Sequence, residues 1–233
     1  MKLSARLAMV AGSVPKNAVV ADIGTDHAFL PIALVERGIA KNVIACDISS
    51  GPLSVAKANV EKSGVQNIEL RLSDGLMEIA PNEADTVTIA GMGGDMIVSI
   101  LSRTEWIKDF KTRLILQPMS SADSLRVFLA ENGFDVLLER AVRDTGRIYT
   151  VITAQYNGTV TGISPGRSYI GTLDREFSAA GEEYIRWQLG VLKEKSAGLC
   201  RVERMNEEYR KTKAAIAEIE EILRAKMKEQ NEH

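Results

Sequence analysis

The chain has 233 residues, of which 45% are hydrophobic, and a formal net charge of −2 at pH 7. This length allows one large domain, or one domain with an appendage, around a sizeable core. The charge balance excludes a global basic field that would recruit nucleic acid, although it is compatible with a local basic patch.

Cysteine and histidine are too scarce for a metal site or a disulfide framework. Cys46 and Cys200 lie far apart in sequence, and the only histidines are His27 and His233. Because no Cys/His cluster occurs, we predict no metal site, and the cysteine usage suits a reducing compartment. No apolar run approaches the ~18 residues that cross a membrane, and the N-terminus lacks an apolar signal core. We therefore expect a soluble, cytoplasmic protein with no membrane partner.

In chain order, the pattern predicts strands that alternate with helices. A short amphipathic helix with Leu3, Leu7 and Val10 at helical spacing precedes a buried first strand, Val19 to Ile23. Further expected elements are helices at 31–38, 50–63, 95–101 and 121–131, strands at 41–46, 68–72, 86–90 and 113–117, and a hairpin of 134–142 and 147–156. This order predicts an α/β fold with a doubly wound, Rossmann-like parallel sheet. The closing antiparallel hairpin is typical of class I methyltransferases.

The composition divides the chain into three parts. Residues 1–157 form the predicted sheet domain, and residues 158–170, rich at first in Gly, Thr, Ser and Pro, form a predicted linker. Residues 171–233 predict an antiparallel, coiled-coil helical hairpin with a turn near Gly198. Its two apolar stripes contain Tyr184, Trp187, Val191 and Leu192, and Met205, Tyr209, Ile216, Ile219 and Leu223. We expect Trp187 and Tyr209 to be hairpin core rather than platforms for base stacking.

Polar residues and glycines follow four strands of the predicted sheet at the point where each strand ends. These segments are Asp22 to His27, Asp47, Asp74 with Gly75, and Gly91 to Gly94. A doubly wound sheet gathers such ends at one crevice. Asp47 follows the first glycine by roughly 20 residues, the spacing at which a carboxylate accepts from both ribose hydroxyls. Asp74 can accept from an adenine amine, and Asp22 can meet an ammonium or hold the loop. The alternatives are a helix cap for Asp47 and simple turns for Asp74 and the glycines.

The constellation favours S-adenosylmethionine over NAD as the cofactor. NAD needs a glycine cradle for its pyrophosphate, and Asp26 stands where the second glycine would be. A carboxylate there repels a pyrophosphate and tolerates a sulfonium and an ammonium. The predicted cofactor contacts are Asp22, Gly24, Thr25, Asp26, His27, Asp47, Ile48, Asp74, Gly75, Gly91, Met92 and Gly93.

Four segments resemble the bacterial tRNA (adenine-22-N1)-methyltransferase family. They are Val20 to Pro31, Ala45 to Ile48, Ala90 to Gly94 and Leu116 to Met119. The Gly-Thr-Asp-His loop and the Gly-Met-Gly-Gly turn are specific to that family rather than generic to methyltransferases. The resemblance covers residues 1–157 by motif, and beyond them it is architectural, because the family carries a C-terminal coiled-coil hairpin. It implies methyl transfer from S-adenosylmethionine to N1 of adenine 22 in tRNA.

The residues are compatible with this chemistry. The Pro-Pro signature of exocyclic-amine methyltransferases is absent where Gly91 to Gly94 stand. Adenine N1 already has an in-plane lone pair, so it needs positioning more than activation, and the base must leave its pair or stack. Asp26 is our catalytic candidate, as an acceptor for the adenine amine that stabilises the cationic product. Its alternatives are tying down the loop and binding the ammonium. His27 is predicted to orient the loop or contact the cofactor, with general base as the alternative.

Substrate contacts are the least specified part of the prediction. We expect them at Gly94, at the cations Lys2, Arg6 and Arg147 as phosphate ligands, and at Tyr149 as a base stacker. The alternative for each of these cations is an ordinary solvent-exposed side chain that binds no phosphate. Two other functions fit the same crevice, namely a small-molecule methyltransferase and a non-catalytic RNA- or protein-binding module. We expect a monomer.

Overall fold

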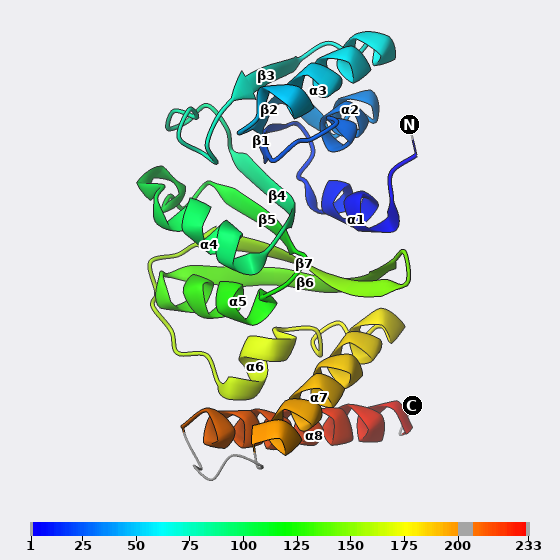
Figure 1. Cartoon of the computed structure of the whole chain (residues 1–233), viewed down its shortest axis with the longest axis vertical. Helices are drawn as coiled ribbons and strands as arrows, with labels where there is room; N and C mark the ends of the chain where they lie inside the picture. Colours follow the sequence, from blue (N-terminus) through cyan, green and yellow to red (C-terminus); the bar gives the residue numbers. More distant parts are fainter. Residues whose placement is uncertain (1, 200–206, 232–233) are drawn as a thin grey trace.

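The computed structural model describes residues 2–199 and 207–231. A seven-stranded sheet with the order β3-β2-β1-β4-β5-β7-β6 forms the body of the molecule, and a helical region lies at the end beyond β6 (Figure 1). The strands are β1 (Ala18–Ile23), β2 (Ala40–Asp47), β3 (Ile68–Leu72), β4 (Thr86–Met92), β5 (Arg113–Pro118), β6 (Phe134–Asp144) and β7 (Arg147–Tyr156). The helices are α1 (Ala5–Ser13), α2 (Phe29–Glu36), α3 (Ser50–Ser63), α4 (Gly94–Ser102), a short 3₁₀ turn η1 (Glu105–Ile107), α5 (Ala122–Glu131), α6 (Pro165–Ile170), α7 (Ala179–Leu199) and α8 (Glu207–Asn231).

The sheet confirms the predicted doubly wound topology with a closing hairpin. Strands β1 to β5 pair in parallel, whereas β7 runs antiparallel to both β5 and β6. Thr145 and Gly146 join β6 to β7 with φ values of 46° and 79°. Two positive φ angles in a two-residue loop give the primed turn whose twist matches that of the paired strands.

Alternating side chains along the strands supply two separate cores, one on each face of the sheet. Val20 and Val43 pack with α1 and α2 on one face, and Ala21 and Ile44 pack with α4 and α5 on the other. Burial on both faces explains why these strands are almost continuously apolar. The layers leave the carboxyl ends of the strands as the place where loops can form a site.

Strand β4 extends further than the sequence predicted. Its expected end was Ala90, but Met92 pairs with Pro118 of β5 after an irregularity at Gly91, whose φ is 86°. Part of the Gly-Met-Gly-Gly segment is therefore strand rather than turn, and helix α4 begins directly at Gly94.

The segment predicted to be a linker, residues 158–170, contains helix α6, and α6 packs against α5 and α8. Beyond it, α7 and α8 pack against each other, with the apolar positions Tyr184, Leu192, Ile219 and Leu223 buried. None of the helices that the structure describes is long and apolar enough to cross a membrane.

Trp187 is not hairpin core, which corrects one expectation. Trp187 is 50% exposed, and Val191, the next residue of the same apolar stripe, is 43% exposed. The buried face of α7 instead follows Tyr184, Ile185 and Leu192, because α7 packs against β6 as well as α8. Tyr209 is half-buried, Gly198, near which the turn was expected, is still part of α7, and Met205 lies outside the described residues.

A buried ion pair joins the helical region to the sheet domain. Arg126 of α5 lies 2.7 Å from Glu139 of β6, and each residue is only 2% exposed. The guanidinium also donates to the carbonyls of Ser168 and Tyr169 in α6, both at 2.8 Å. One buried cation therefore bonds to the sheet domain and to the helical region at the same time.

The carboxylate of Glu139 completes this junction network. It accepts from the Thr150 hydroxyl at 2.6 Å and from the Thr172 backbone N–H at 3.0 Å. Gly171, with φ of 57°, passes so close that a methyl group there would overlap the carboxylate. The partners of Glu139 therefore come from α5, from β7 and from the segment that follows α6, and these bonds tie the helical region to the sheet domain.

Candidate active site

A cavity of about 220 Å³ lies above the carboxyl ends of β1 and β4. The strand order reverses at β1, which is where ligands bind in doubly wound sheets. The cavity brings together two of the four predicted segments. Its lining is Arg6, Leu7, Asp22, Gly24, Thr25, Asp26, His27, Phe29, Leu30, Ala90 and Gly91.

The loop between β1 and α2 is bound tightly to the end of β2. The backbone N–H groups of Gly24 and Thr25 both donate to the Cys46 carbonyl, at 2.9 and 2.8 Å. The N–H of Asp26 donates to Asp47 Oδ2 at 3.3 Å. Gly24 and Asp26 have φ values of 72° and 52°, the left-handed region that glycine and aspartate tolerate best. The loop conformation is therefore fixed by the neighbouring strand and places its side chains over the cavity.

Asp22 is a buried acid that has no basic partner in the part of the chain that the structure describes. It is 4% exposed, and the Thr88 hydroxyl donates to its Oδ1 at 2.6 Å. Burial raises the pKa of Asp22 to about 6, against the lowering by the hydrogen bond from Thr88, and the charge of Asp47 raises it further. No ion pair to Asp22 occurs among residues 2–199 and 207–231. A buried carboxylate in a cavity wall is a site that a ligand cation would stabilise.

The side chains of Asp26 and His27 form a close pair at the cavity mouth. Asp26 Oδ2 lies 2.8 Å from His27 Nδ1, and the side chains are 68% and 44% exposed. The imidazole also stacks on Phe29 with 5.3 Å between ring centroids. Asn59 of α3 donates to the His27 carbonyl at 2.9 Å. The pair is oriented by its neighbours and yet open to a substrate.

Asp47 and Ile48 lie at the end of β2, beside the cavity rather than in its lining. Asp47 Oδ1 accepts from the Ser49 N–H at 3.0 Å while its other oxygen holds the Asp26 loop. A carboxylate has about four acceptor sites, so these bonds leave capacity for ribose hydroxyls. Ile48 is 66% exposed. The predicted cofactor contacts at both residues stay predictions.

Asp74 and Gly75 lie at the end of β3, also outside the lining of the cavity. Arg103 at the end of α4 donates to both oxygens of Asp74, at 2.9 and 3.1 Å. The hydrogen bonds from Arg103 lower the pKa of this exposed carboxyl. Gly75, with φ of 62°, lies against Ile100 of α4. The predicted adenine contact at Asp74 would have to share the carboxylate with Arg103.

The Gly-Met-Gly-Gly segment is shaped by contact with the loop that follows β5. The N–H of Gly94 donates to the Ser120 carbonyl at 2.8 Å, and a methyl group at position 94 would overlap the Ser121 carbonyl. At Gly93, an added methyl carbon would lie 3.1 Å from Ser120 Oγ. The Met92 carbonyl accepts from the Met119 N–H at 2.8 Å. Packing within the chain thus explains the glycine at 94, and the predicted substrate contact there stays a prediction.

Gln117 is a buried residue that holds several neighbours of the cavity, and it was not predicted as a site residue. It is 0% exposed, and its Oε1 accepts from Arg6 Nη1 at 2.6 Å and from the Gly91 N–H at 3.1 Å. The Arg6 backbone N–H donates to Asp144 at the tip of β6. Arg6 of α1 is therefore part of the cavity wall, held by Gln117 of β5 and Asp144 of β6. A carboxamide in an otherwise apolar strand was the signal that could have identified Gln117.

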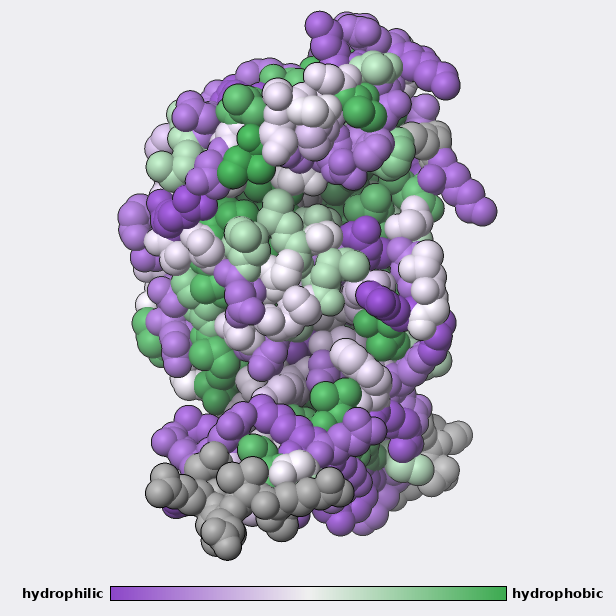
Figure 2. All heavy atoms as spheres, in the orientation of Figure 1, coloured by the Kyte–Doolittle hydropathy of each residue, from purple (hydrophilic) through white to green (hydrophobic). Residues whose placement is uncertain are grey.

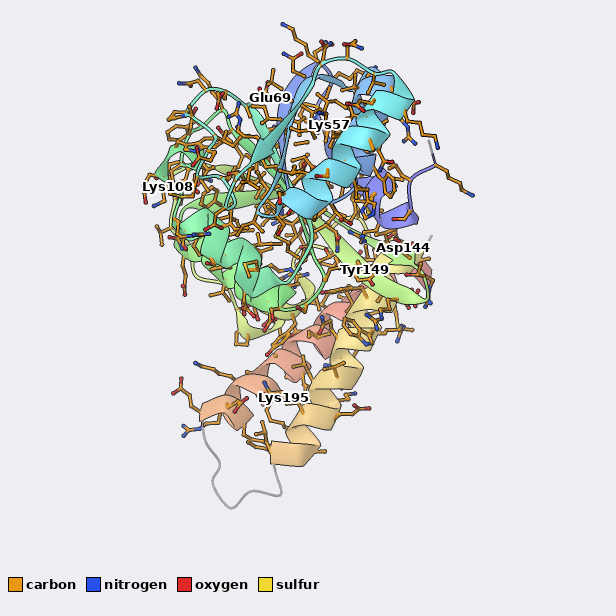
Figure 3. The ribbon with its side chains drawn as sticks, turned by 45° about the horizontal axis from the view of Figure 1, so that its top comes forward. Lys57, Glu69, Lys108, Asp144, Tyr149 and Lys195 are labelled. Carbon is orange, nitrogen blue, oxygen red and sulfur yellow. The ribbon has the colours of Figure 1, made fainter. Side chains whose placement is uncertain are left out.

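The other predicted substrate residues lie away from the cavity. Lys2 and Arg147 are exposed, with Arg147 next to the β6–β7 turn. Tyr149 is only 7% exposed and lies in the wall of a separate groove between the sheet domain and the helical region. Figure 3 labels Tyr149 at this junction. The structure therefore does not bring these three residues to the crevice.

Several known proteins share this sequence pattern. Residues 3–152 match a family model described as a methyltransferase domain. The tRNA (adenine(22)-N(1))-methyltransferase of Bacillus subtilis is 43% identical over 156 residues, a match that covers 66% of each protein. The match to a tRNA methyltransferase homologue from Mycoplasma genitalium is 34% identical and covers 62% of that protein. The aligned region thus spans slightly less than two thirds of the length of these curated relatives.

Solved structures match over nearly the whole chain, the helical region included. The crystal structure of the Bacillus subtilis tRNA methyltransferase TrmK is 34% identical with a TM-score of 0.79, and the match covers 97% of this chain and 98% of that one. A Streptococcus pneumoniae structure in complex with S-adenosyl-L-methionine is 32% identical with a TM-score of 0.79, and covers 95% of this chain and 100% of that one.

Proposed function

The chain belongs to the family of bacterial tRNA (adenine-22-N1)-methyltransferases, and on that premise we propose that it transfers a methyl group from S-adenosylmethionine to N1 of an adenine in tRNA. Position 22 is the position in the name of its Bacillus subtilis relative. The observation that carries the proposal is the cavity at β1, where the buried Asp22 has no basic partner among the described residues and Asp26 lies at the mouth. Negative charge in this place suits a cationic adenosyl ligand. We propose that the protein carries out this reaction as a monomer.

The residues around the crevice fit the parts of this cofactor. Asp22 would accept hydrogen bonds from the ammonium, which would relieve the unfavourable burial of its charge. Asp47 would accept from the ribose hydroxyls, and Asp74 from the adenine amine. Gly24 and Gly91 both have positive φ, and a methyl group at position 24 would overlap the Met92 side chain, whereas one at position 91 would lie 3.5 Å from Arg6 Nη1. Bound here, the cofactor supplies an electrophilic methyl group on a positively charged sulfur.

The chain's own residues have to hold the target base rather than activate it. Adenine N1 carries its lone pair in the ring plane, so no proton has to be removed before attack, and correct alignment is the main requirement. Asp26 would accept a hydrogen bond from the adenine amine and stabilise the positive charge that develops on the ring. His27 holds the Asp26 carboxylate through its Nδ1 and thereby sets its direction. We assign His27 this orienting role.

Substitution of Asp26 tests the assignment. We expect Asp26→Asn to lower kcat for tRNA methylation by about 10²-fold, the usual effect of removing one group that stabilises developing charge. The dissociation constant of S-adenosylhomocysteine should stay unchanged. Asp135→Asn is the matched control, because Asp135 is exposed at the opposite end of the sheet. Near-normal turnover of Asp26→Asn would remove Asp26 from the mechanism.

Transfer of labelled methyl from S-adenosylmethionine tests the function itself. Bulk bacterial tRNA and a metabolite extract are offered to the protein in parallel, and the labelled product is digested and identified by mass spectrometry. We expect 1-methyladenosine in the tRNA. Label in small molecules would instead identify a small-molecule methyltransferase, and cofactor binding without any transfer would identify a binding module. Methylation of an exocyclic amine alone would contradict the ring-nitrogen chemistry.

A further inference from the structure

Trp187 is a large aromatic side chain left half exposed on the inner side of a docked helix. It lies on α7 and is 50% exposed, whereas its neighbour Tyr184 is 3% exposed. The two rings pack edge to face, with centroids 5.6 Å apart and planes at 65°. This contact fixes one edge of the indole and leaves much of its surface open to solvent.

The support under Trp187 is rigid. The Tyr184 hydroxyl accepts from Gln188 Nε2 at 3.1 Å and from Arg126 Nη2 at 3.4 Å. Arg126 is the buried cation that bonds to Glu139. The ring that orients Trp187 is therefore part of the junction network between the sheet domain and the helical region. A preorganised aromatic surface loses little freedom when it binds a ligand.

Trp187 lines a groove between the two parts of the molecule. The groove has a volume of about 470 Å³. Met119, Ser120 and Tyr149 belong to its sheet-domain side, and Trp187, Val191 and Lys195 belong to its α7 side. Figure 3 labels Tyr149 at the junction and Lys195 further along α7. Most of the surrounding surface of the helical region is hydrophilic (Figure 2), so the apolar side chains in the groove are distinctive.

One loop lines the groove and also contacts the residues that follow Gly91 of the crevice lining. The loop that follows β5 provides Met119 and Ser120 to the groove. The same two residues bond to the end of β4 and the start of α4, through Met119 N–H to the Met92 carbonyl and Gly94 N–H to the Ser120 carbonyl, each at 2.8 Å. This loop is therefore the element that connects the two sites, from the residues that follow Gly91 of the crevice lining to the groove that Trp187 lines.

We propose that Trp187 is a stacking platform for an unpaired base of the RNA substrate, close in sequence to the adenine that enters the crevice. This inference rests on the proposed function. An adenine that presents N1 has left its stack, so its neighbours lose a stacking partner that an aromatic side chain can replace. Lys195 forms an exposed ion pair with Glu208 at 3.0 Å, whereas Trp187 and Val191 give this wall its exposed apolar surface, which favours base stacking. Aromatic surfaces bind bases of any identity, because every base has a π-face.

Two variants of Trp187 test the stacking role. We expect Trp187→Ala to raise the KM for tRNA about 10-fold, the loss typical of one stacked base, with the S-adenosylhomocysteine affinity and Tm unchanged. Trp187→Phe keeps a stacking ring and should stay within about 3-fold of wild type. Val160→Ala is the matched control, because Val160 is 68% exposed and outside the groove lining. A wild-type KM for Trp187→Ala would overturn the proposal.

Fluorescence reports on stacking directly. The chain has two tryptophans, so Trp106→Phe leaves Trp187 as the only indole. Titration of this variant with tRNA should quench and shift its emission, because a stacked base quenches indole and displaces water from it. If the variant methylates tRNA while its emission stays constant, the stacking proposal fails and the proposed function stands. If neither this variant nor the wild type binds or methylates tRNA, both fail.

Discussion

Glu139 and Asp22 are carboxylates with almost the same burial, at 2% and 4% exposed, but their surroundings are opposite. Glu139, in the junction network, accepts from Arg126, from the Thr150 hydroxyl and from the Thr172 backbone. Asp22, in the crevice, has one short bond from a hydroxyl and no basic partner among the described residues. A buried charge costs several kcal/mol unless it is paired and hydrogen-bonded. The junction meets that requirement within the chain, whereas the crevice leaves it to a ligand.

Glu139 therefore holds two parts of the molecule together, whereas Asp22 is placed to bind a ligand. At the junction, satisfied bonds fix α6 and α7 against the sheet. At the crevice, burial without a cation raises the pKa of Asp22 to about 6, so the free protein is strained electrostatically in the place where we propose an ammonium binds. Perturbed acids of this kind are more common at functional sites than in structural networks.

The largest expected effect is at the junction. Glu139→Ala would leave the buried Arg126 without its counter-ion, and we expect a loss of about 3–5 kcal/mol in the free energy of unfolding. The control is Glu176→Ala, which removes the exposed ion pair between Glu176 and Arg140 and should cost at most ~1 kcal/mol. Urea denaturation of both variants provides the measurement. Similar losses for the two would show that the junction network is no more important than a surface pair.

The second prediction concerns Asp22 in the crevice, where substitution should stabilise the free protein instead of destabilising it. The folded-state pKa of Asp22 is raised from 3.8 to about 6, so the folded protein binds a proton more tightly than the unfolded chain. The free energy of unfolding therefore falls as pH rises from about 4 to about 6. Above pH 6 the full cost of the buried Asp22 charge is present. Asp22→Asn removes the charge and keeps an acceptor for Thr88. We expect it to stabilise the free protein at pH 7.5 by up to about 3 kcal/mol.

The same substitution should damage binding. Without its charge, position 22 cannot neutralise an ammonium, so we expect Asp22→Asn to weaken S-adenosylhomocysteine binding by about 10-fold or more, in line with the worth of a hydrogen bond to a charged group. In the wild type, affinity should fall as pH drops below 6, because the carboxyl becomes protonated. Asp135→Asn serves again as control. Calorimetry at pH 5 and pH 8 measures both quantities, and an unchanged stability together with an unchanged affinity would contradict the assigned role of Asp22.

The sequence predicted the crevice better than it predicted the junction, for a physical reason. Strand ends are marked locally, since an apolar run followed by Asp22 or Asp47 and a glycine turn is visible in a short window. The Arg126–Glu139 pair joins positions on α5 and β6 that have no shared periodicity, and its other partners come from α6 and α7. Trp187 was misplaced for the same reason, because the side of α7 that becomes buried depends on a contact with β6 that no helical spacing reveals.

The smallest stability effect is expected at the exposed rim of the crevice, where Asp74 pairs with Arg103. Because water screens an exposed pair, Arg103→Gln and Asp74→Ala should leave Tm unchanged within error. Their effects on ligand binding should differ. If Asp74 accepts from the adenine amine, Asp74→Ala should raise the dissociation constant of S-adenosylhomocysteine about 3- to 10-fold, as one lost hydrogen bond does, whereas Arg103→Gln should stay within about 2-fold. Equal losses in the two variants would mean that Arg103 orients the carboxylate and is part of the adenine site. No loss in either would limit the binding charges to Asp22 and Asp47, the acids nearest the β1 loop.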